Sequence, residues 1–558
     1  MELPVSTATA TTKTAPPTDN FYSPSNSAFY SHRPYQSLDK TCCTIRLLRV
    51  TKDANGELQC QLADGIPMTT AYDTYTAISY CAGDPKNTRS VLVNGLSFNA
   101  FANLAIAIEE TYNHRSNDHG DVEAVLWADQ ICINQSDVTE RSHQVGFMRD
   151  IYASARDVAV CLSTVEERGS LALYWIEGMY NNDRALREDR QPTLSAANRT
   201  FFNQQGKFDD DHIETKLNDA EFSEGLRDFW QMISQPWWER AWVYQEYAVA
   251  RNTTFLYGGT SADGRYLMAV LLALLNDRAT IVRIHKRMEL YKHNYDSKRE
   301  NHLQPSLGLE AFVKSVKIVL SVLSHDQSAT EVLTFARLLV HSRMCAASDK
   351  RDHVYAFMGL AENSYGVTID YCGENTCEAV FTQLTRQMII HDGDLRALVY
   401  VGDIDHVRSA HLPSWVPDWS SNACYSTLRT MSMKFLESEA RRLGWQPHTT
   451  FSQNGNVLQV SGIRLDIFHQ GSIQVWESCS IIARTAQGRK VHLSSQICIN
   501  DELWYLLGAY APFILRPDGS HYELVYSNIF YEAATQCEDW KEKYVAAMQE
   551  PPVRISIK

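Results

Sequence analysis

The chain is 558 residues long, with 44% hydrophobic residues, 21% charged residues and a formal net charge of −14. A chain of this length and composition can bury a large core, and we expect two or three folded domains. The negative charge excludes general binding to the phosphate backbone of nucleic acids as the main function.

Neither a membrane segment nor a disulfide framework is expected from the sequence. The N-terminus lacks the basic stretch and apolar run of a secretory signal, and the longest apolar run, at 266–275, is far shorter than the roughly 20 residues that cross a bilayer. We therefore expect a cytoplasmic protein without a membrane span. The 13 cysteines are scattered without a C-x-x-C pair, so we predict reduced thiols and no metal site.

Four regions are distinguished by composition along the chain. Residues 1–40 are rich in Ser, Thr and Pro and predict a disordered leader, with order beginning near Thr44. Residues 41–260 predict an α/β domain with its motifs at 75–247 and a polar surface insertion at 181–219. Residues 261–400 predict a helical region, and 401–558 a β-rich C-terminal domain.

The α/β domain opens with strands and tight turns. Asn55-Gly56 and Asn94-Gly95 each stand between apolar segments and predict two hairpins. Between them, residues 75–80 predict a strand that runs into a loop at Gly83, where a glycine allows close approach of the backbone. A helix is expected after residue 101.

The stretch 124–162 predicts one strand, helix and strand unit. An apolar run ends at Asp129, Asp137 and Glu140 form a capping pair for a helix, and residues 158–162 give the next strand. Ligands of open parallel sheets sit beyond the carboxyl ends of the strands, so Asp129 and Asn134 lie where a ligand is expected. The alternative is that both residues only tie down the turn.

Residues 236–246 form the third motif and predict a helix. At a spacing of four, Trp238, Trp242 and Glu246 share one face of that helix. A carboxylate beside indoles is partly desolvated, which raises its pKa and suits it to chemistry. The alternative is that Glu246 pairs with Arg240 and fastens the helix.

Together these patterns predict a parallel-stranded α/β core with strands near Thr76, Val125, Val158 and Phe255, in which residues 125–128 pair directly with residues 158–162. In such a core, residues of the three motifs converge on one cleft. The residues expected there are Tyr80, Gly83, Asp129, Asn134, Arg240, Trp242 and Glu246. By contrast Asp352 and His353 are neighbours that point apart on a helix, so we expect a structural role for them.

The three motifs resemble those of the heterokaryon-incompatibility (HET) domain of filamentous fungi. The resemblance is carried by 126–135 with the helix behind it, by 236–246, and by 79–83, where Ala82 stands in the position of a tryptophan. Segments 347–360 and 412–419 also resemble the region C-terminal to the core in relatives. The resemblance implies a TIR/flavodoxin-like parallel sheet core and a role in nonself recognition that ends in growth arrest or cell death.

The stretch from Trp242 to Glu246 is also similar to the TIR segment that ends in a catalytic glutamate, with Val243 in place of a cysteine. The similarity implies an NAD glycohydrolase in which Glu246 is catalytic, the other six residues bind NAD as substrate, and no cofactor is held. The alternative is a non-enzymatic interaction module. Protein partners, including further copies of the chain, are expected in either case.

Overall fold

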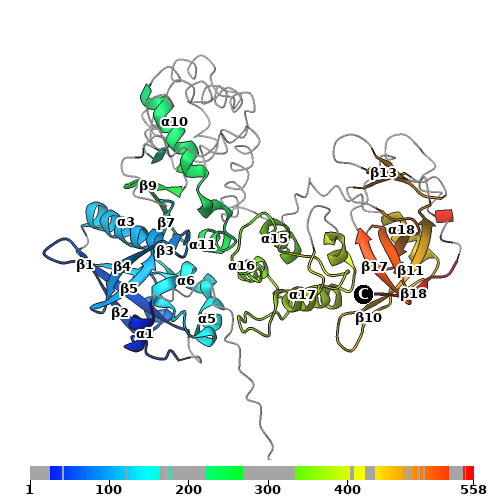
Figure 1. Ribbon diagram of the computed structural model, residues 1–558, viewed down its shortest axis with the longest axis horizontal. Coiled ribbons are helices and arrows are strands. Elements are labelled where there is room, and N and C mark those ends of the chain that lie inside the picture. Colours follow the sequence, from blue (N-terminus) through cyan, green and yellow to red (C-terminus); the bar gives the residue numbers. More distant parts are fainter. Residues whose placement is uncertain are drawn as a thin grey trace, which may run out of the picture.

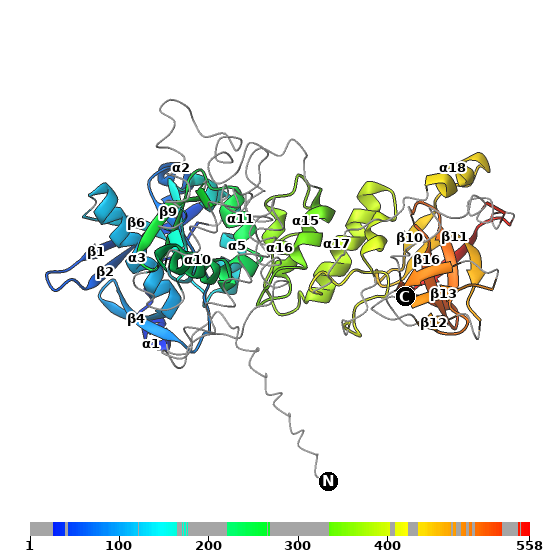
Figure 2. The same ribbon diagram turned by 90° about the horizontal axis from the view of Figure 1, so that it is seen from above.

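The computed structural model describes residues 26–39, 43–120, 122–163, 220–264, 334–401, 408–421, 434–469, 497–509, 511–526 and 550–558, with shorter pieces between these ranges. Residues 1–25 and the predicted insertion 181–219 lie outside this description. The α/β region stands at one end of the molecule, helices α15 to α17 follow, and a β-rich region stands at the other end (Figures 1 and 2).

A nine-stranded sheet organises the α/β region, in the order β5-β4-β2-β1-β6-β3-β7-β8-β9. Its strands are β1 (Thr44–Lys52), β2 (Leu58–Pro67), β3 (Thr76–Tyr80), β4 (Thr88–Val93), β5 (Leu96–Phe101), β6 (Ala124–Trp127), β7 (Asp157–Cys161), β8 (Thr253–Tyr257) and β9 (Thr260–Asp263). The four predicted strands β6, β3, β7 and β8 are parallel. The sheet as a whole is mixed, because the two hairpins and β9 add antiparallel pairs.

Strand β3 lies at the centre of the parallel strands. All five of its residues are buried, as expected for an apolar strand covered on both faces. It pairs with β6 on one side, Thr76 opposite Leu126, and with β7 on the other, Tyr80 opposite Cys161. The expectation that the strands near Val125 and Val158 pair directly is therefore wrong, since the chain crosses from β6 over β3 to reach β7.

Helices cover the sheet and carry the motifs. Those of the α/β region are α2 (Met68–Ala71), α3 (Ala102–His119), α4 (Asp129–Cys132), α5 (Val138–Val145), α6 (Met148–Ser154), α10 (Ala220–Ile233), the 3-10 helix η2 (Pro236–Glu239) and α11 (Val243–Ala248). The predicted cap is present, because the carboxylate of Asp137 accepts from the amides of Thr139 and Glu140. The single helix predicted after it is divided into α5 and α6 at Gly146 and Phe147.

The structure differs from the prediction of a disordered leader over part of its length. Residues 26–39 pack on the sheet and include helix α1 (Ser27–Ser31). The ring of Phe29 is 2% exposed and lies 5.0 Å from that of Phe98, and Asn26 exchanges hydrogen bonds with the backbone of Asn99. A few apolar side chains in a polar segment are enough to dock it on a preformed surface.

The rest of the described chain is helical and then β-rich. The helices are α15 (Phe335–Ser342), α16 (Asp352–Met358), α17 (Cys377–Asp392), η3 (Arg396–Tyr400) and α18 (Lys434–Arg442). The strands are β10 (Thr449–Phe451), β11 (Leu458–Ile467), β12 (Ile473–Val475), β13 (Ile481–Arg484), β14 (Lys490–Leu493), β15 (Glu502–Leu506), β16 (Phe513–Asp518), β17 (His521–Tyr526) and β18 (Val553–Ile557). Strand β11 pairs with both β15 and β18, which closes β11, β15, β16, β17 and β18 into a barrel-like ring.

Candidate functional site

Glu246 on α11 lies at the centre of a buried polar cluster. Its side chain is only 4% exposed. The hydroxyl of Ser79 on β3 donates to Oε2 of Glu246, and Nη1 of Arg240 lies 3.6 Å from the same oxygen. Arg240 also donates to the carbonyl oxygen of Tyr80. The first and third motifs are thus joined by these contacts.

The hydroxyl of Ser79 connects Glu246 to an indole. Nε1 of Trp237 donates to Oγ of Ser79 at 2.8 Å, while the same hydroxyl donates to Glu246. Ser79 is 0% exposed. Neither Ser79 nor Trp237 was among the predicted site residues. The available signal was a serine within a strand segment that is predicted to be buried, since a buried hydroxyl needs a partner.

Asp129, at the start of α4, brings the second motif to the same place. The hydroxyl of Tyr80 donates to its Oδ1 at 3.0 Å, the amide of Gln130 donates to the same oxygen at 2.7 Å, and its carbonyl oxygen accepts from Gln135 Nε2. The structure therefore brings Tyr80, Asp129, Arg240 and Glu246 together at the carboxyl ends of β3 and β6, where the sequence predicted a site.

Burial sets the electrostatics of this cluster. It raises the pKa of both carboxyls, Asp129 and Glu246, and the positive charge of Arg240 opposes the rise in each case. Hydrogen bonds to the ionised forms act in the same direction as Arg240, from Tyr80 to Asp129 and from Ser79 to Glu246. Two desolvated carboxyls sharing one guanidinium are suited to holding a proton or to facing a developing positive charge.

The helix predicted for the third motif is wrong. Arg240 is extended (φ −71°, ψ 137°) between η2 and α11, and it forms a parallel bridge with Ala346. Trp238 therefore does not share a face with Glu246 but stacks on Phe255, with ring centroids 5.5 Å apart. The pairing with a segment distant in sequence overrides the local helical pattern.

Three predicted site residues do not touch Glu246 through their side chains. Gly83 has a φ of +76°, and a Cβ there would lie 2.7 Å from Nδ2 of Asn103, so its place is explained by packing. Asn134 ties down its turn as the alternative predicted, accepting from the hydroxyl of Ser136 at 2.6 Å. Trp242 is half-buried directly before α11, and it is one of the residues that lower the pKa of Asp352.

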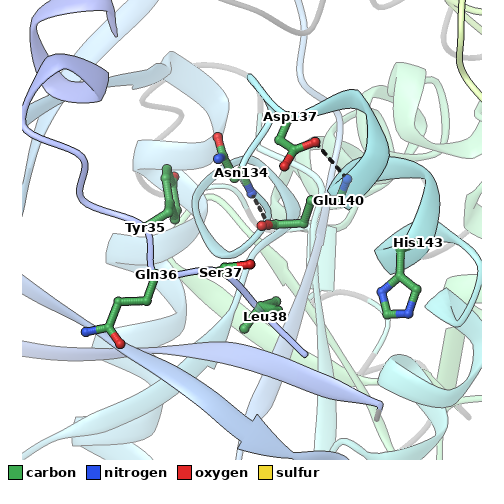
Figure 3. Close-up of a pocket in the computed structure, with 8 residues that line it drawn as sticks. All are labelled: Tyr35, Gln36, Ser37, Leu38, Asn134, Asp137, Glu140 and His143. Atoms are coloured by element: carbon green, nitrogen blue, oxygen red, sulfur yellow. Dashed lines mark hydrogen bonds between the residues drawn. The ribbon is translucent and has the colours of Figure 1, made fainter. Parts of the chain in front are cut away.

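A pocket of about 230 Å³ lies between residues 26–39, the docked leader segment, and the turn before α5 (Figure 3). Glu246 is not among the residues that line it. Its lining residues are Tyr35, Gln36, Ser37, Leu38, Asn134, Asp137, Glu140 and His143. Of the predicted site residues, Asn134 lines this pocket. The structure thus separates Asn134 from the Glu246 cluster instead of placing all seven residues in one cleft.

Replacing Ser79 by alanine is expected to lower the free energy of unfolding of the α/β region by about 1–3 kcal/mol, because the indole of Trp237 loses its acceptor and Glu246 loses a donor inside the core. Urea unfolding followed by circular dichroism measures the change. Ser136→Ala, an exposed hydroxyl of a turn, is the control. Equal effects of the two substitutions would contradict the role of Ser79.

No group of three or more His, Cys, Asp and Glu side chains in the described residues is placed to hold a metal ion. The cysteines that the structure describes carry free thiols. No helix in the described ranges is both long and apolar enough to span a bilayer.

Comparisons with known proteins agree with the three motifs. Residues 75–246 match the family described as Heterokaryon incompatibility protein (HET). A Neurospora crassa protein named Heterokaryon incompatibility protein 6, OR allele, is 26% identical over 451 residues, which cover 75% of this chain and 62% of the relative. The match thus spans less than two thirds of the relative's length. No solved structure matches the chain significantly. Residues 75–246 of this chain are therefore similar to the HET family.

Proposed function

We propose that this chain acts in fungal nonself recognition, as an incompatibility protein whose HET domain triggers growth arrest or death of fused cells. The support is the match of residues 75–246 to the HET family and the similarity to a Neurospora protein that is named for incompatibility. The place of action we propose is the cytoplasm, where the contents of fused cells mix.

For the mechanism, the first candidate that we propose is that the HET domain is an interaction module with a TIR-like core. The observation behind this choice is the state of Glu246, whose carboxylate is buried, bonded to Ser79 and paired with Arg240. A carboxylate held in this way fastens β3, α11 and the residues between them into one rigid unit. Partners of the module are other proteins, including further copies of the chain.

Hydrolysis of NAD is the second candidate, and one observation favours it. Two carboxyls with raised pKa values, Asp129 and Glu246, gather with Tyr80 and Arg240 at the carboxyl ends of parallel strands. In this reaction the bond between nicotinamide and ribose breaks, nicotinamide leaves, and water adds to the ribose carbon. Glu246 would face the positive charge that develops on ribose, and Asp129 would accept from ribose hydroxyls. Because Glu246 is covered, we expect turnover only after assembly has rearranged the site.

An assay of nicotinamide release separates the two mechanisms. Purified full-length protein is incubated with NAD, both dilute and tethered at high density on vesicles. The interaction-module mechanism predicts no release above buffer in either state. Release that appears on clustering, is lost in Glu246→Gln and persists in Glu239→Gln, an exposed glutamate of the same motif, would establish the enzyme instead.

A further inference from the structure

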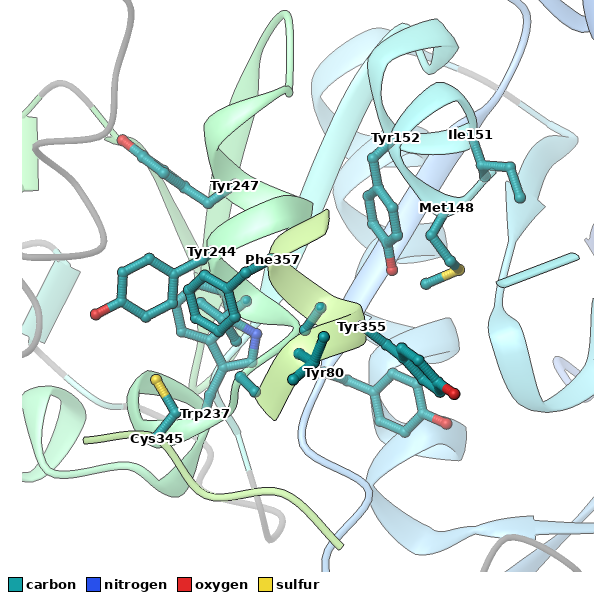
Figure 4. Packing of buried hydrophobic residues seen from close by; sticks show 14 of the residues in the cluster. Tyr80, Met148, Ile151, Tyr152, Trp237, Tyr244, Tyr247, Cys345, Tyr355 and Phe357 are labelled. Carbon is teal, nitrogen blue, oxygen red and sulfur yellow. The ribbon is translucent and has the colours of Figure 1, made fainter. Parts of the chain in front are cut away.

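Residues 342–371 lie outside the matched HET domain in sequence but pack directly against it. The amide of Ala241 donates to the carbonyl oxygen of Ala346 at 3.1 Å, within the bridge that holds Arg240 extended. The ring of Phe357 on α16 lies 5.2 Å from that of Tyr244 on α11. Figure 4 shows Tyr355 and Phe357 in one buried cluster with Tyr80 and Tyr244.

Gly359, at the end of α16, marks how closely this segment approaches α11. A Cβ at this position would lie 2.8 Å from Nε2 of Gln245 and 3.0 Å from Cβ of Arg149. Its φ of −68° is ordinary, so the glycine is required by the contact and not by the backbone conformation. The two segments therefore fit each other without a side chain between them.

Asp352, the first residue of α16, carries the polar part of this contact. It is 3% exposed, and it accepts from the hydroxyl of Tyr371 at 2.6 Å. The charged groups near it are Asp349 and Arg351 of its own segment, with Arg141 of α5 beyond Tyr371. Both guanidinium groups lie over the ring of Tyr371, at 4.6 Å for Arg141 and 5.1 Å for Arg351.

Trp242 connects Asp352 to the Glu246 cluster. It directly precedes α11, and its carbonyl oxygen accepts from the amide of Glu246 at 3.0 Å. The backbone of Trp242 thus begins the helical turn that carries Glu246. A change at Asp352 can also reach this turn through α16, which packs on α11 at Phe357 and Gly359.

We infer that Asp352 is a positioning residue for the Glu246 cluster: it anchors the start of α16, and residues 342–371 complete the HET domain by packing α16 against α11. The inference rests on the proposed role of that cluster in the function of the HET domain. It assigns a task to a buried carboxyl for which the sequence predicted only a structural role on a helix.

The ionisation of Asp352 provides a test that is independent of biological activity. Burial raises the pKa of Asp352 to about 7, and the negative charge of Asp349 adds to the rise, whereas Tyr371, Trp242 and Arg351 lower it. An exposed aspartate has a pKa of about 3.9. When α16 opens, Asp352 releases its proton above pH ~4, so the closed state is favoured at low pH and loses this stability as the pH rises towards ~7.

Hydrogen exchange of the full-length protein measures the effect. Protection is first corrected for intrinsic exchange rates. For the peptide that covers residues 242–248, it should fall by up to about tenfold per pH unit as the pH rises from about 5 to 7, and it should stay constant above about pH 7. In Asp352→Asn the protection should not change over this range. In Asp349→Asn the levelling should occur at lower pH, because a like charge is removed.

Two outcomes would overturn the inference: protection of α11 that does not depend on pH in the wild type, or the same pH dependence in Asp352→Asn. The peptide that covers α17 in the same digest is the internal control, and it should not follow the substitution. If Asp352→Asn does not fold, wild-type protein and Asp349→Asn still decide the question. Hydrogen exchange is measured without any biological activity. A negative exchange result would therefore reject the role of Asp352, whereas a wild-type protein that does not arrest growth would reject the proposed function.

Discussion

Replacing Arg240 by methionine is expected to lower the free energy of unfolding of the α/β region by about 3–5 kcal/mol at neutral pH. The substitution keeps much of the side-chain volume but leaves the carboxylate of Glu246 buried without its partner, with Asp129 close enough to disfavour a second negative charge. Urea unfolding of the full-length protein, monitored at the transition of the α/β region, gives the change.

The pH dependence of this loss arises from the same contacts. Without the guanidinium, Glu246 loses the main influence that lowers its pKa, so its folded pKa rises further above the unfolded value. The variant is then favoured by protonation, and its deficit should shrink as the pH falls towards 5. Arg251→Met is the control, because Arg251 is 40% exposed and its surface pair with Asp73 contributes little. Equal losses in the two variants would contradict the importance of the buried pair.

Replacing Arg46 by methionine is expected to have an effect of similar size, about 3–5 kcal/mol, and to release residues 26–39. The side chain of Arg46 is 0% exposed. It bonds to Asp64 at 2.7 Å, to Glu140 at 2.6 Å and to the carbonyl oxygen of Gln36 at 2.6 Å. The substitution would leave Glu140 buried and remove the bond that holds the docked leader segment.

Limited proteolysis and urea unfolding test this second expectation together. Arg46→Met should be cleaved within 26–39 at protease concentrations that leave the wild type intact. Arg49→Met is the matched control on the same strand, since Arg49 is 55% exposed and pairs with an exposed Glu123; it should change the free energy of unfolding by less than about 0.5 kcal/mol. A leader segment that stays resistant in Arg46→Met would show that its other contacts, among them those of Phe29 and Asn26, hold it without Arg46.

The parallel core could be predicted from the sequence because its strands are short apolar runs closed by polar turns. Each of β3, β6, β7 and β8 is largely buried, so local composition alone marks it. The order of the strands could not be predicted in the same way. Placing β3 between β6 and β7 depends on contacts between distant segments, and the helical connection is compatible with either neighbour.

The candidate site was predicted in part for a similar reason. Tyr80, Asp129, Arg240 and Glu246 lie in recognisable motifs and come together. Trp237 lies outside the predicted site because the sequence predicts one helix for the third motif, whereas pairing with Ala346 breaks that helix at Arg240. No local pattern shows that a segment about a hundred residues further on supplies that pairing.

Growth after expression in a filamentous fungus tests the proposed function most directly. Wild-type protein, Arg240→Met and the control Glu239→Gln are produced from one inducible promoter, with protein levels matched by immunoblot. We predict that wild type and Glu239→Gln arrest growth, whereas Arg240→Met, with the buried pair removed, does not. Normal growth with the wild-type protein, or full arrest by Arg240→Met at the same level, would contradict an incompatibility protein that depends on the Glu246 cluster.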